Sequence, residues 1–166
     1  MTAIEAAVLV FAVGLGILFL SLGGFSLSGI ATNATKLIAQ AIATAEGFYV
    51  SGSIPQTANN PGDIADNGVT QWTGDTGQRI TSANGAQIIV FDNITDGWNA
   101  LYGLIGAILA GEGSYSGAST LQQIGEIYSG GSQAWVNNVA STLGISPSTN
   151  LSQWASSVSS TTGVSS

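Results

Sequence analysis

The chain has 166 residues, with two basic and nine acidic side chains and a net charge of −7 at pH 7. Two cations cannot neutralise a series of phosphates, which excludes nucleic acid as a partner. Cysteine and histidine are both absent, so disulfides, thiolate or imidazole metal sites and histidine-assisted nucleophiles are excluded, and we expect no metal and no cofactor.

The N-terminal segment is apolar enough to cross a membrane. No charged residue occurs from Ala6 to Leu22, and the apolar character continues to residue 28. A helix of this length spans the ~30 Å hydrocarbon core at ~1.5 Å per residue. The acidic start MTAIE lacks the positive charge of a secretory signal peptide. We therefore predict a transmembrane anchor over residues 1–29, inserted through residues 6–28.

The same segment has a second interpretation. MTAIEAAVLVFAVG, with Glu5 ahead of an apolar run, resembles the mature start of type IV pilins, whose N-terminal helices pack into a filament core. This resemblance implies a filament subunit that assembles through residues 1–28. Four glycines interrupt the run, namely Gly14, Gly16, Gly23 and Gly24, and both interpretations stay open at this stage.

Residues 32–48 form the first predicted helix of the following domain. Apolar residues recur there at the i, i+3, i+4 spacing, with polar residues on the opposite side, and Gly47 and Pro55 end the pattern. Glu46 lies at the border of the apolar stripe and at the helix C-terminus. Apolar neighbours and the negative end of the helix dipole both raise the pKa of a carboxyl group. A raised pKa is what a general acid working near neutral pH requires.

The middle of the chain is rich in turns. Residues 56–85 contain many glycines and asparagines and predict loops, whereas AQIIVF at residues 86–91 predicts one strand after a turn at residues 83–85. Trp72 lies in the polar loop and is the first candidate for stacking on a sugar ring.

Three more helices complete the prediction. One begins near residue 94, with Thr95 or Asp96 as its cap, and ends near Gly111. A short helix over residues 119–130 has Ser119 or Thr120 as its cap, and another over residues 132–146 closes at Gly144. Trp98, Trp135 and Tyr102 lie at helical spacings and are predicted core residues. We expect residues 155–166 to be a flexible Ser/Thr-rich tail.

Several motifs in this order resemble one family. They are IAQAIATAEGFY, GSIP, ANNPGDI, ITSANGAQIIVFDNITDGWNALY, TLQQIGEIYSGG and WVNNVASTLGIS. Between about Leu37 and Leu151 the chain is similar to the lysozyme-like family of phage and bacterial peptidoglycan-degrading proteins, which includes virion-associated lytic transglycosylases. The resemblance implies a mainly α, lysozyme-like α+β fold for residues 30–154 and glycan strands of peptidoglycan as the substrate.

The resemblance also implies roles for individual residues. Glu46 takes the position of the acid that protonates the glycosidic oxygen between N-acetylmuramic acid and N-acetylglucosamine. Asn59 and Asn60 match a loop that shapes the cleft and contacts substrate, and Tyr102 matches a position that can face the cleft. A transglycosylase needs no second carboxylate, because the substrate's acetamido group and 6-hydroxyl complete the reaction. Otherwise a second carboxylate is required, and the candidates are Asp63, Asp66, Asp75 and Asp92.

Three classes of function follow. The first is a peptidoglycan lytic transglycosylase or lysozyme, anchored in a virion internal membrane or the bacterial cell envelope with its domain facing the cell wall. The second is a structural protein that has the lysozyme-like fold without activity. The third is the pilin-like filament subunit, and the second and third imply virion or filament assembly partners.

Overall fold

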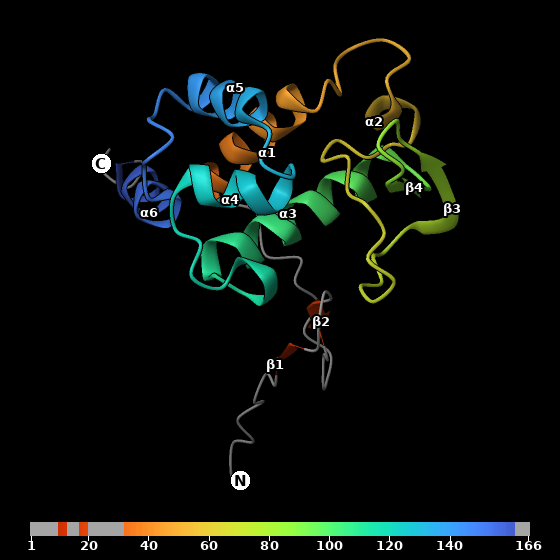
Figure 1. Cartoon of the computed structure of the whole chain (residues 1–166), viewed down its shortest axis with the longest axis horizontal. Coiled ribbons are helices and arrows are strands. Elements are labelled where there is room, and N and C mark those ends of the chain that lie inside the picture. Colours follow the sequence, from red (N-terminus) through yellow and green to blue (C-terminus); the bar gives the residue numbers. More distant parts are fainter. Residues whose placement is uncertain (1–9, 13–16, 20–31, 162–166) are drawn as a thin grey trace, which may run out of the picture.

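A computed structural model describes residues 10–12, 17–19 and 32–161. Within residues 32–161, six α-helices, a short 3-10 helix and a two-stranded antiparallel sheet alternate along the chain (Figure 1). The elements are α1 (Asn33–Ala45), α2 (Ile54–Thr57), β3 (Asp75–Thr81), β4 (Gln87–Phe91), α3 (Ile94–Ala110), η1 (Gly113–Tyr115), α4 (Leu121–Tyr128), α5 (Gln133–Leu143) and α6 (Leu151–Thr161). The predicted fold class is confirmed at this level: the described domain is mainly helical with one small sheet.

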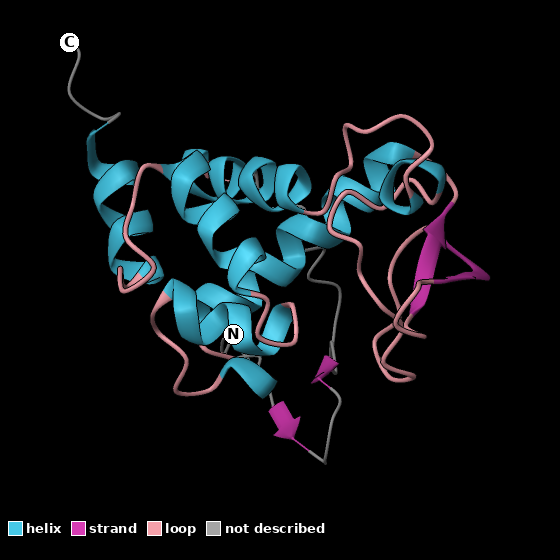
Figure 2. Cartoon of the chain, turned by 45° about the horizontal axis from the view of Figure 1, so that its top comes forward, coloured by secondary structure: helices cyan, strands magenta, loops and turns pink. Residues whose placement is uncertain are grey.

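The helices and the sheet occupy opposite sides of the domain. Helices α1, α4, α5 and α6 gather on one side, the β3–β4 hairpin and α2 lie on the other, and α3 runs between them (Figures 1 and 2). Helix α1 is central because α3, α5 and α6 all contact it. Its buried face is built from two isoleucines and several alanines, which let neighbouring helices approach closely: Ala34, Ile38, Ala39, Ala41, Ile42 and Ala43.

The N-terminal prediction is only partly covered by the described residues. Val10–Ala12 and Ile17–Phe19 form two short antiparallel strands, β1 and β2, where a single transmembrane helix was predicted. At these six residues the helix prediction is wrong, and the rest of residues 1–31 lies outside the described part. Among the described residues no helix is both long and apolar enough to span a membrane.

Most predicted helices are confirmed, with local corrections at their ends. Helix α1 begins after the Thr32 cap, α4 has a full capping box from Thr120, and α5 ends at a left-handed Gly144. The predicted cap of α3 is wrong. Asn93 holds that position, since its side chain accepts from the backbone N–H of Asp96, and an asparagine there satisfies an otherwise free helix donor.

Three elements differ from the prediction. The tail is helical to Thr161, because Leu151 and Ala155 are buried in the core and Val158 packs against it. The predicted fraying after Trp154 is therefore wrong. Strand β3 was predicted as loop, since its mostly polar residues show no apolar alternation. Helix α2 contains Pro55 in its first turn, where proline is favourable and does not break a helix.

Arg79 connects the hairpin to the loop that precedes it. Its guanidinium group donates two hydrogen bonds to Asp75, at 2.7 and 2.9 Å, and Nε donates a third to Asp66 at 2.7 Å. This fork, together with backbone N–H donors from Gly68 and Gly77, lowers the pKa of both carboxyl groups. Two of the candidate second carboxylates are thereby engaged in holding the β region together.

Candidate active site

Glu46 lies at the C-terminal end of α1, where its backbone N–H closes the last turn on the carbonyl of Ile42. Its side chain is half-buried. Trp135 Nε1, on α5, donates a hydrogen bond of 2.7 Å to Glu46 Oε1. Trp135 is 5% exposed, so the donor is held in the core and fixes the orientation of the carboxyl group.

The pKa of the Glu46 carboxyl group is raised towards neutrality. Burial is the main cause that raises its pKa, from an ordinary value of 4.5 to about 7, and the charge of Asp63 acts in the same direction. The hydrogen bond from Trp135 opposes both effects because it stabilises the ionised form. The direction agrees with the sequence prediction, although the contribution of Asp63 was not foreseen.

The loop that carries Asp63 is attached to the free edge of β4. Backbone bonds join Phe91 N to the carbonyl of Ala58 at 2.9 Å and Ile89 N to the carbonyl of Ile64 at 3.0 Å. Asn59 Nδ2 adds a bond to the carbonyl of Phe91 at 3.2 Å. These bonds fix the loop to the sheet, with Asp63 close enough to Glu46 for its charge to act on that carboxyl group.

Asn60 has a structural role, which corrects its prediction as a substrate-binding residue. It is 0% exposed. Its Nδ2 donates to the carbonyls of Ile64 and Ile89, at 3.0 and 2.9 Å, while Oδ1 accepts from Ile64 N at 2.9 Å. With every bond of its amide group directed at buried backbone, Asn60 has none left for a substrate. Asn59 is half-buried and bonded to β4, so it too holds the loop.

Asp63 is the one of the four candidate carboxylates that acts electrostatically on Glu46. Its backbone has a φ of 47°, a left-handed conformation that costs a residue with a side chain about 1–3 kcal/mol but that Asp and Asn tolerate best. Partial burial raises the pKa of its carboxyl group. Oδ1 is buried and accepts no hydrogen bond from any described residue, a situation that ordinarily costs about 1–3 kcal/mol.

The other three carboxylates lie elsewhere. Asp66 and Asp75 are bound to Arg79, and Asp92 is exposed at the end of β4. None of them is among the groups that shift the pKa of Glu46.

Tyr128 contacts a neighbour of each carboxylate: Trp135, which is bonded to Glu46, and Gly62, which precedes Asp63. Its ring stacks on Trp135 with centroids 5.0 Å apart, and its hydroxyl donates to the carbonyl of Gly62 at 2.6 Å. Burial raises the pKa of Tyr128, and the charges of Glu46 and Asp63 add to the shift. The hydroxyl therefore stays protonated and holds Gly62, the neighbour of Asp63, against the helical side of the domain.

A cavity of ≈ 350 Å³ opens at Asp63. Asp63 and Tyr128 line it, together with Trp72, Leu104 and Tyr115. Glu46 and its hydrogen-bond donor Trp135 are not lining residues, but Asp63, whose charge acts on Glu46, is one. The structure thus brings Trp72, predicted to stack on a sugar, into the same cavity as a carboxylate that acts electrostatically on Glu46. Aromatic and apolar walls with a few polar groups are typical of ligand sites.

Tyr102 lies outside this cavity. It stacks on Trp98 with centroids 6.0 Å apart, and Trp98 meets Phe48 edge to face at 5.7 Å. Tyr102 is therefore part of an aromatic cluster at the surface of α3 and not of the cavity that contains Asp63.

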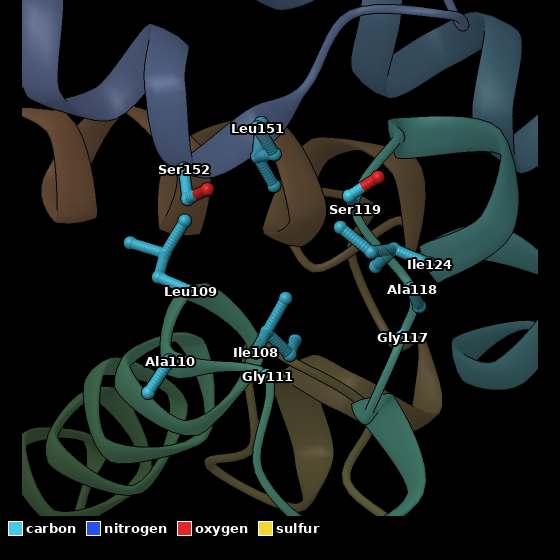
Figure 3. A pocket seen from close by; sticks show the side chains of 10 residues that line it. All are labelled: Ile108, Leu109, Ala110, Gly111, Gly117, Ala118, Ser119, Ile124, Leu151 and Ser152. Carbon is cyan, nitrogen blue, oxygen red and sulfur yellow. The ribbon is translucent and has the colours of Figure 1, made fainter.

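A second cavity of ≈ 230 Å³ lies where α3, the segment at residues 117–119 and α6 meet (Figure 3). Its lining is mainly apolar, with Ser119 and Ser152 as the polar side chains, and it contains no titratable group. Within the described residues, no three Asp, Glu, His or Cys side chains gather where they could hold a metal ion. The pair Glu46 and Asp63 therefore defines the candidate active site.

Comparisons of the chain with protein-family models, with curated proteins and with solved structures found no match. The resemblance to lysozyme-like proteins consequently stays a prediction, and the function has to be argued from the site.

Proposed function

We propose that this protein cleaves the glycosidic bond between N-acetylmuramic acid and N-acetylglucosamine in peptidoglycan, as a lysozyme or a lytic transglycosylase. The observation that carries the proposal is the Glu46 carboxyl group, whose pKa is raised to about 7 by burial and by the charge of Asp63, a carboxylate that lines a cavity together with Trp72. A carboxyl group that is protonated near neutral pH can donate its proton to a leaving oxygen.

The surroundings of Glu46 suit this role. Trp135 orients the carboxyl group and continues to stabilise it after the proton has left. The indole of Trp72 offers a flat apolar surface of the kind on which a sugar ring stacks. The chain has few charges, which suits an uncharged glycan backbone better than a phosphate-bearing polymer.

The remaining parts of the proposal concern location. Residues 6–28 would hold the protein in a membrane, either the internal membrane of a virion or the bacterial cell envelope, with the domain facing the wall. The apolar composition of this segment supports membrane attachment, and the proposal does not rely on a single spanning helix, because Val10–Ala12 and Ile17–Phe19 are strands.

Digestion of purified peptidoglycan by the full chain tests the proposal. The expected result is release of soluble muropeptides by the parent and by Glu126→Gln, whose carboxylate lies exposed on α4. The rate should be at least ~10²-fold lower for Glu46→Gln, because general-acid catalysis contributes about 10²–10⁴-fold. If the folded parent releases nothing between pH 4 and 8, the glycosidase proposal fails and a structural or filament role replaces it.

A second prediction concerns the hydrogen bond to Glu46. Trp135→Phe keeps a ring to stack on Tyr128 but removes the N–H donor, and that donor lowers the pKa of Glu46. The pKa should therefore rise further. In a pH–rate profile on peptidoglycan, the decline of activity on the alkaline side should move to higher pH in the variant. An unchanged or lower midpoint would show that this bond does not act on the catalytic acid.

A further inference from the structure

We infer that Asp63 is the second catalytic carboxylate, a general base that activates water, so that the reaction is a hydrolysis and not an intramolecular transglycosylation. This inference rests on the proposed function, because it assigns the partner of Glu46 in the same site. It selects one of the two routes that the sequence leaves open.

The first argument is the position in which Asp63 is held. Its backbone is in the left-handed region, and hydrogen bonds hold the loop on both sides. The side chain of Asn60 joins the loop to β4, and the hydroxyl of Tyr128 joins the loop to α4. Gly62 fits so closely that an added Cβ would lie 2.8 Å from Leu101 Cδ1. A strained residue in such a rigid setting is often a functional one, since the surrounding structure has to maintain the strain.

The second argument is that Asp63 has no protein partner that would occupy its carboxylate. Arg79 is committed to Asp66 and Asp75, and Lys36 is exposed on α1. The buried Oδ1 accepts no hydrogen bond from a described residue, while the side chain lines a cavity with room for water and a sugar ring. A carboxylate whose only purpose was to hold the fold would be paired or capped.

The third argument is the difference between the two carboxyl groups. Burial raises the pKa of Glu46 to about 7, and the charge of Asp63 adds to this shift; burial also raises the pKa of Asp63. An ionised Asp63 therefore favours the protonated form of Glu46. This asymmetry, together with the open cavity at Asp63, assigns Glu46 as the acid and Asp63 as the base.

The reaction then balances without any other reagent. Glu46 gives its proton to the glycosidic oxygen as the bond from that oxygen to the anomeric carbon breaks. Asp63 takes a proton from water, and the water oxygen forms the new bond to the anomeric carbon. The cycle closes when the proton on Asp63 passes through solvent to Glu46, leaving two hydroxyl-terminated glycan ends.

Digestion in water enriched in ¹⁸O tests this assignment with the full chain. The parent should release muropeptides with one ¹⁸O atom at each new reducing end. Asp63→Gly, in which glycine suits the left-handed backbone, should melt no lower than the parent and lose at least ~10²-fold in rate. Sodium azide or formate should restore part of that activity, because a small anion can enter the space left by the carboxylate. Asp92→Asn, an exposed control, should match the parent.

The outcomes separate the inference from the proposed function. Unlabelled 1,6-anhydro products from the parent, or full activity in Asp63→Gly, would overturn the role of Asp63 while Glu46 remained the acid. A folded Asp63→Gly variant that no anion rescues would likewise reduce Asp63 to a positioning residue. Release of no product by the parent would refute the glycosidase function itself, and this inference with it.

Discussion

Glu46→Gln should be more stable than the parent at pH 8 by about 3 kcal/mol, and by less than about 1 kcal/mol at pH 5. The pKa of Glu46 is raised from 4.5 to about 7 in the folded chain. Between these values the folded protein keeps a proton that the unfolded chain releases, so the parent loses stability as the pH rises through this interval. Glutamine cannot ionise, and its Oε1 can still accept from Trp135.

Urea unfolding of both proteins at the two pH values measures this difference, with Glu126→Gln as the control. A stability difference that is the same at pH 5 and pH 8 would contradict the raised pKa.

At acidic pH the effect of pH on the stability of the parent has the opposite sign. Asp66 and Asp75 have lowered pKa values, so the stability they contribute is present above pH 4 and is lost as the pH falls through their folded values. The parent should therefore be most stable at mildly acidic pH.

Asn60→Ala should destabilise the protein by about 3 kcal/mol or more. The substitution leaves Ile64 N without its acceptor and removes the Asn60 donor from the carbonyls of Ile64 and Ile89; each buried group left unsatisfied costs about 1–3 kcal/mol. It also leaves a cavity where the amide was. The loop that carries Asp63 would keep its backbone bonds to β4 but lose its side-chain attachment, so activity should fall together with stability.

Thermal and urea unfolding measure this effect. Asn137→Ala is the matched control, since Asn137 is exposed on α5 and bonds only to Gln133 among the contacts described, and it should stay within about 0.5 kcal/mol of the parent. A loss below 1 kcal/mol for Asn60→Ala would show that the loop does not depend on this side chain.

The two halves of the site differ in how far the sequence predicts them. The environment of Glu46 follows from local pattern, because an apolar stripe and a helix end are both visible within a few turns of chain. Its partners are not visible in this way. Trp135 lies 89 residues away, and helical spacing identifies it only as a core residue, without showing that its N–H points at Glu46.

The NNPG loop shows the same limit. Asparagines beside a proline and a glycine are typical of turns, and only the resemblance to lysozyme-like proteins implied a substrate contact for Asn60. The structure buries it because β4, 29 residues further along, needs partners at its free edge. Likewise, four aspartates are equivalent in the sequence, and the Arg79 fork and the attachment of the loop to β4 distinguish Asp63 from the others.

Helix α6 was missed for a different reason. Leu151, Trp154, Ala155 and Val158 follow the helical spacing, but the many serines between them suggested a flexible tail. Packing against α1 and α3 outweighs the weak helix propensity of serine. In this case the periodic signal was present in the sequence and composition obscured it.

Titration of the Glu46 carboxyl carbon by ¹³C NMR, with Glu46→Gln to assign its signal, tests the central claim most directly. The account predicts a midpoint near pH 7, well above the ordinary value of 4.5. A midpoint near 4.5 would mean that Glu46 is ionised at neutral pH, and it would contradict its role as the acid of this site.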